Sequence, residues 1–104
     1  MEAHIFKALG DPLRLKIVRR LSRGSVYTVG SLTKNLGITR QGARKQIQVL
    51  ESAHIVKLKS VGREVNVVLN INTLKMGKDF ILDLENKWDT RLRKLKEVVE
   101  KANF

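Results

Sequence analysis

The chain has 104 residues, enough for one domain with a modest hydrophobic core and too few for two independent cores. It has no cysteine and no apolar run of membrane-spanning length, which excludes disulfides and thiolate metal sites and leads us to expect a cytoplasmic protein without a membrane partner. The formal net charge of +11 favours a polyanionic partner such as nucleic acid, although a basic surface can also serve solubility alone.

Two short helices are predicted at the start of the chain. Apolar residues around Ile5 and Ala8 favour a helix that Gly10 ends. Asp11 followed by Pro12 is typical of an N-cap and a first helical residue, so a second helix is predicted to begin at Pro12. The residues expected to form its buried stripe are Leu13, Ile17, Val18 and Leu21.

The other face of this second helix is basic. It carries Arg14, Arg19 and Arg20, and Arg23 follows shortly before Gly24, the expected helix stop. We expect this face to be solvated, with the last arginines complementing the helix dipole; contact with phosphates is the alternative.

A helix-turn-helix is predicted next. Val29, Leu32 and Leu36 have the spacing of a two-turn helix that ends at Gly37. The glycine permits a tight turn, and Ile38 is expected to fill the angle between the two helices. Such helix pairs also occur in proteins that bind no nucleic acid.

The second helix of this pair, over about residues 39–52, has two faces. Ala43, Ile47 and Leu50 form an apolar stripe, while the opposite face carries Arg, Lys and Gln side chains that can pair with base edges and phosphates. Gly42 is unexpected in a helix, where glycine costs about 1 kcal/mol relative to alanine, and we interpret it as permitting close approach to DNA or to the preceding helix. The expected DNA-binding residues of this helix are Thr39, Arg40, Gln41, Arg44, Lys45 and Gln48.

Two β-rich runs, 55–59 and 65–69, predict a hairpin with a basic tip. A hairpin directly after a helix-turn-helix is typical of the wing of a winged-helix domain, here over about residues 55–69. Arg63 is placed to reach a DNA groove or phosphate, and Lys59 is a weaker candidate. Arg63 could instead be an ordinary turn residue.

Residues 72–104 are predicted to be helical to the end, with apolar residues that recur in heptads. About 30 residues at roughly 1.5 Å each give a rod of about 45 Å, longer than a small core can cover, so we expect a homodimer. Gly77 is expected to separate a lead-in from the main helix, and Trp88 could instead belong to the core of a monomer. The expected dimer-interface residues are Ile81, Leu84, Trp88, Leu92 and Leu95.

Several strings of the sequence then resemble the ArsR family of winged-helix transcriptional regulators. They are residues 5–15, 37–41, 45–51 and 62–64, so the resemblance runs nearly end to end. Residues 88–92 resemble a subgroup of that family that lacks the metal-sensing cysteines.

The resemblance implies a mainly α-helical fold with a small β-hairpin, in which residues 1–71 form a winged helix-turn-helix for DNA binding. Residues 72–104 would be a long C-terminal dimerisation helix of the same single domain. It also implies a homodimeric regulator, usually a repressor, that binds a palindromic operator in double-stranded DNA. The family's base-reading positions fall on Arg40, Gln41, Arg44 and Lys45, with wing contact at Arg63.

Two positions depart from the family pattern. Arg44 stands where the family commonly has a small hydroxyl residue, and Gln46 stands where it commonly has histidine. We therefore expect an operator sequence that differs from those of relatives. Residues 27–31, which correspond to the stretch that carries the family's sensing cysteines, contain none, and His4 and His54 are the only imidazoles, so we expect no metal site and no cofactor.

No catalytic constellation can be assembled from the sequence. The chain offers no cysteine nucleophile, no serine with recognisable histidine and acidic partners, and no glycine-rich phosphate loop, so we do not expect an enzyme. The alternative function is a winged-helix interaction module that binds RNA or a protein. Salt-dependent, sequence-selective binding to duplex DNA separates these readings, and the sequence does not indicate an effector.

Overall fold

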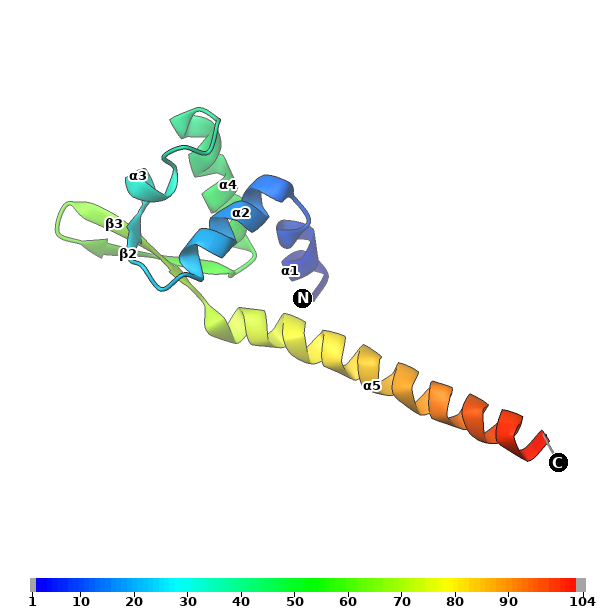
Figure 1. The fold of residues 1–104 in the computed structure, drawn as a ribbon. Coiled ribbons are helices and arrows are strands. Elements are labelled where there is room, and N and C mark those ends of the chain that lie inside the picture. Colours follow the sequence, from blue (N-terminus) through cyan, green and yellow to red (C-terminus); the bar gives the residue numbers. More distant parts are fainter. Residues whose placement is uncertain (1, 103–104) are drawn as a thin grey trace.

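A computed structural model of the chain describes residues 2–102. Helices are packed around a small sheet, and one long helix runs away from them (Figure 1). The expected class, a mainly α-helical winged helix-turn-helix with a long C-terminal helix, is confirmed. The elements are α1 (Glu2–Leu9), α2 (Pro12–Leu21), β1 (Tyr27–Thr28), α3 (Val29–Leu32), α4 (Arg40–Ser52), β2 (Val56–Val61), β3 (Glu64–Leu69) and α5 (Ile71–Ala102).

Local sequence determines where α2 begins. The Asp11 side chain accepts hydrogen bonds from the backbone N–H groups of Leu13 (2.9 Å) and Arg14 (3.1 Å), and Pro12 stands at the first helical position, where its missing N–H is not needed. The helix ends at Leu21, earlier than the expected stop at Gly24, which lies in the following turn with φ of +82°.

The described strands form an antiparallel sheet in the order β1-β3-β2, so the hairpin is paired at one edge by the short β1. Val61 pairs with Glu64, which leaves a two-residue turn whose first residue, Gly62, has φ of +62°. A side chain would be strained at that φ, and glycine is favoured there. The predicted hairpin is therefore confirmed, with longer strands and a tighter tip than the sequence suggested.

The core lies where α1, α2, α3 and α4 meet the sheet. The predicted inner face of α4 is confirmed, because Ala43, Ile47 and Leu50 are all buried. The largest fully buried side chains are Ile5, Ile17, Leu32, Leu50, Ile55 and Val56.

The first helix of the helix-turn-helix is shorter than predicted. The expectation of two turns ending at Gly37 is wrong, because α3 has a single turn and ends at Leu32. Leu36 is nevertheless buried in the core, whereas Ile38, which was expected to fill the angle between the helices, remains 41% exposed.

Arg20 binds backbone carbonyls at the early end of α3 and in the turn that follows it. Its Nη1 donates to the carbonyls of Leu32 (3.0 Å) and Lys34 (2.6 Å), and its Nη2 donates to the carbonyl of Asn35 (3.4 Å). These carbonyls therefore bond to a side chain of α2 rather than to amides of a longer helix, and Asn35 takes a left-handed φ of +61°. The expectation that Arg20 belongs to a solvated face is wrong.

Gly77 does not interrupt α5, contrary to the predicted break. It is buried against α1: a Cβ added there would lie 3.5 Å from Ile5 Cγ2 and 3.9 Å from the Phe6 ring. The rings of Phe6 and Phe80 also pack with centroids 5.6 Å apart. Gly77 therefore lies at a close helix-to-helix contact, and α5 runs unbroken through Ala102; residues 103–104 of the predicted helix lie outside the described residues.

Replacing Gly77 with alanine is expected to raise the free energy of unfolding by about 0.5–1 kcal/mol, because alanine favours the helix and its methyl group would make only ordinary contacts with α1. Gly77→Leu should instead lower it, because the larger side chain would push α1 away from α5. Urea denaturation measures both; equal effects of the two substitutions would contradict the close contact.

Candidate nucleic-acid interface

Helix α4 is the element that carries most of the predicted contacts. Its N-terminus is capped as expected, with the Thr39 hydroxyl accepting from the Gly42 backbone N–H at 3.0 Å. A Cβ at Gly42 would lie 3.1 Å from that hydroxyl and 3.8 Å from Ile38 Cδ1. Glycine therefore leaves room for the cap and for Ile38, a reason that the sequence interpretation did not include.

The outward face of α4 is polar and accessible. The side chains opposite the buried stripe are exposed, so the helix presents donors to solvent along its length while its other face packs on the core. The one acidic residue of α4 is Glu51, near its C-terminal end. The exposed candidates on and beside this helix are Thr39, Arg40, Gln41, Arg44, Lys45 and Gln48.

The wing lies beside this face. The surface is hollowed between α3, α4 and the wing over a volume of about 460 Å³, and Arg44, Gln48 and Arg63 are among the residues that line it. Glu64 is the acidic residue among those that line this hollow. The fold thus brings together a predicted wing residue and two predicted residues of α4. Lys59 is exposed on β2 but does not line this hollow.

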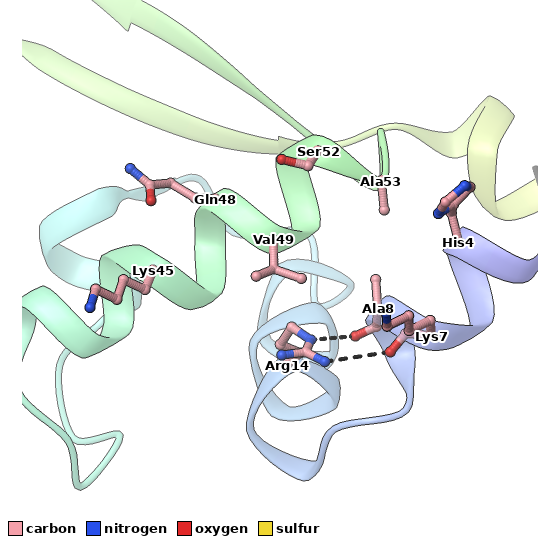
Figure 2. A pocket seen from close by; sticks show the side chains of 9 residues that line it. All are labelled: His4, Lys7, Ala8, Arg14, Lys45, Gln48, Val49, Ser52 and Ala53. Carbon is pink, nitrogen blue, oxygen red and sulfur yellow. Dashed lines mark hydrogen bonds between the residues drawn. The ribbon is translucent and has the colours of Figure 1, made fainter.

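Lys45 lines the edge of a different hollow, between α1, α2 and α4 (Figure 2). His4, Lys7 and Arg14 also line it, and Val49 contributes to an apolar floor. The predicted polar face of α4 therefore borders two hollows, one shared with the wing and the other shared with α1 and α2, and Gln48 lines both.

Arg14 does not belong to a solvated face, contrary to expectation. It is half-buried, its Nε donates to the carbonyl of Ala8 at 2.6 Å, and its Nη1 donates to Gln46 Oε1 at 2.8 Å. Gln46, which we expected to alter operator preference, thus points its amide oxygen at α2. A sequence pattern could not reveal this pair, because its members are 32 positions apart.

The predicted dimer residues lie on the part of α5 that leaves the core. Ile81, Leu84, Trp88, Leu92 and Leu95 are between 46% and 62% exposed. Ile81 lies beside α1 and lines a hollow with Ile5 and Phe6. The molecule is elongated, with extents of 73 × 25 × 23 Å. Lys87–Asp83 and Lys96–Glu100 pairs on this helix are exposed and contribute little stability.

Metal binding and membrane insertion each require a feature that can be sought among the described residues. No group of three or more His, Cys, Asp or Glu side chains within residues 2–102 is placed to hold a metal ion. None of the helices in that range is both long and apolar enough to cross a membrane.

Known proteins resemble the chain in both sequence and structure. A family described as a helix-turn-helix domain matches residues 9–59. The transcriptional repressor SdpR of Bacillus subtilis (strain 168) is 27% identical over 89 residues, which are 86% of this chain and 98% of that protein. YuzN, an uncharacterized HTH-type transcriptional regulator of the same organism, is 39% identical over 77 residues, 68% of this chain and 84% of that protein.

A solved structure, an ArsR-like transcriptional regulator from Rhodococcus sp. RHA1, superposes with a TM-score of 0.82 at 28% identity. The match covers 93% of this chain and 91% of that one, so it includes most of α4, of the wing and of α5.

Proposed function

The chain belongs to the ArsR family of DNA-binding winged helix-turn-helix transcriptional regulators, and from that premise we propose that it is a repressor that binds a palindromic operator as a homodimer. In this proposal residues 1–71 read the DNA and residues 72–104 hold the two chains together. The name of the relative SdpR, a transcriptional repressor, supports repression as the output.

The observation that carries the proposal is the hollow shared by α4 and the wing. Arg44 and Gln48 come from the helix and Arg63 from the wing tip, so donors from both elements meet at one surface. Arginine can pair with guanine in a major groove and glutamine with adenine, while the wing can contact the backbone alongside. With α4 in the major groove, these side chains would face base edges and phosphates together.

The exposed apolar strip of α5 supports the homodimer. Ile81, Trp88 and Leu95 recur every seven residues, and Leu84 and Leu92 lie three or four residues from them, so all five would be covered when two such helices pack together. A twofold dimer presents the same reading helix twice in opposite directions, which matches a palindromic site with half-sites about one helical turn apart.

Footprinting on duplex DNA from upstream of the protein's own gene tests the proposal most directly. We expect a protected palindrome, with an affinity that falls steeply as salt is raised. The same protein is then offered single-stranded and structured RNA of equal length. A preference for RNA, or equal affinity for every duplex, would favour the alternative of an interaction module.

Arg44→Ala is expected to weaken binding to the protected site by about 1–3 kcal/mol and to relax the base preference at one position of each half-site. The reason is the loss of a side chain that can donate two bonds to one base. Fluorescence anisotropy with specific and random duplexes measures the effect, and Arg93→Ala, an exposed arginine on α5, is the matched control. An equal loss on random DNA would show that Arg44 contacts only phosphate.

A further inference from the structure

Arg14 joins two helices that are separate in the sequence. Its guanidinium lies between α1 and α4, with bonds to the carbonyls of Ala8 (2.6 Å) and Lys7 (3.4 Å), as Figure 2 shows. A third bond runs from Nη1 to the amide oxygen of Gln46 at 2.8 Å. One planar side chain thus holds both the end of α1 and the side of α4.

These bonds suit a positional role. The last carbonyls of a helix have no amide partner within the helix, and at the end of α1 Arg14 donates to that of Ala8. The carbonyl of Lys7 accepts from the Gly10 backbone N–H (3.2 Å) as well as from Arg14. A charged donor makes stronger bonds than a neutral one, and the rigid fork of arginine fixes the direction of its partners. Both Arg14 and Gln46 are half-buried, so water competes with these bonds less than it does at the open surface.

The opposite side of α1 contacts α5. Ile5 and Phe6 pack where Gly77 allows a close approach, and the Phe6 ring packs against that of Phe80 at an interplanar angle of 51°. A continuous chain of contacts therefore runs from α5 through α1 and Arg14 to Gln46 on α4.

Gln46 directly follows two candidate DNA-binding residues. Arg44 and Lys45 precede it on α4, and a rotation of the helix at Gln46 would move both of them. Specific binding by a dimer requires its two α4 helices to lie at a fixed separation and direction. Contacts with the phosphates of DNA of any sequence tolerate a change in the direction of α4.

Building on the proposed function, we propose that Arg14 and Gln46 are a positioning pair, which sets the direction of α4 relative to α1 and α5 and so makes the dimer selective for its operator. Neither residue needs to touch a base for this role. Losing the pair should reduce the ratio of specific to random DNA affinity, because α4 is then held less firmly.

The first test compares three variants by this affinity ratio. Gln46→Leu keeps the size of the side chain and removes the acceptor, so the ratio should fall by about tenfold. Gln46→Glu keeps an acceptor for Arg14, so its ratio should stay within about twofold of the wild-type ratio. Arg14→Lys keeps the charge but lacks the fork, so the ratio should fall between these two values.

The second test measures the direction of α4 without DNA. Because the chain has no cysteine, Glu51→Cys on α4 and Asp79→Cys on α5 provide two unique positions for spin labels. The labelled protein is diluted with unlabelled chain so that only distances within one chain are measured. Gln46→Leu should broaden the distribution of distances between the labels, and Gln46→Glu should leave it as in the wild type.

The outcomes separate the two proposals. A wild type that prefers no duplex contradicts the proposed function, while the label distances still report on the pair. If Gln46→Leu lowers the affinity ratio but leaves the distance distribution unchanged, Gln46 itself contacts a base. If both the ratio and the distances are unchanged, the pair does not position α4. Either result overturns this inference.

Discussion

Replacing Trp88 with glutamate is expected to leave the chain folded but monomeric, and to remove its preference for a palindromic site. Trp88 is 62% exposed in the single chain and lies at the centre of the apolar strip of α5. In the proposed dimer its ring would be covered by the second chain, and large aromatic residues at the centre of an interface commonly contribute 2 kcal/mol or more, up to about 4. A carboxylate buried there without a partner would oppose association further.

Sedimentation velocity at micromolar concentration measures the change in mass, and circular dichroism verifies that the helices remain. Thr90→Glu is the matched control, because it changes the charge equally two residues away on another face of α5. The control should remain dimeric. A dimeric Trp88→Glu variant that protects the palindrome normally would show that the chains associate through a different surface.

Arg20→Ala is expected to lower the free energy of unfolding by about 1–3 kcal/mol and to weaken binding to specific DNA even in the folded protein. The substitution removes the donors for the carbonyls of Leu32, Lys34 and Asn35. Water can solvate these carbonyls partly, so the cost stays below the sum of the bonds. The turn between α3 and α4 would then be less restrained, and the N-terminus of α4 with it.

Urea denaturation measures the stability, and anisotropy at a temperature where both proteins are folded measures the affinity. Arg19→Ala removes the same charge from an exposed position next to Arg20 and should change stability by less than about 0.5 kcal/mol. If the two variants lose equal stability, the bonds to the turn contribute nothing and charge alone explains the loss.

Features that depend on neighbouring residues follow from the sequence. Asp11 and Pro12 start α2, Thr39 caps α4, and Gly62 turns the wing, and each acts on a backbone group within a few positions. Periodicity likewise indicates which face of α4 is buried, because the helical repeat places every third or fourth residue on one side. The overall class and the polar face of the candidate site could therefore be predicted.

Other features depend on contacts between distant parts of the chain. Arg20 of α2 bonds to carbonyls at and beyond the end of α3, Arg14 bonds to both α1 and α4, and Gly77 of α5 packs against α1. The sequence pattern predicts a solvated face for Arg14 and Arg20 and a helix break at Gly77. Composition and spacing cannot identify contacts with residues that are distant in the sequence, because only the folded chain brings those residues together. A side chain's intrinsic preference is worth about 1 kcal/mol, and a few specific bonds or close packing outweigh it, so the tertiary fold decides these positions.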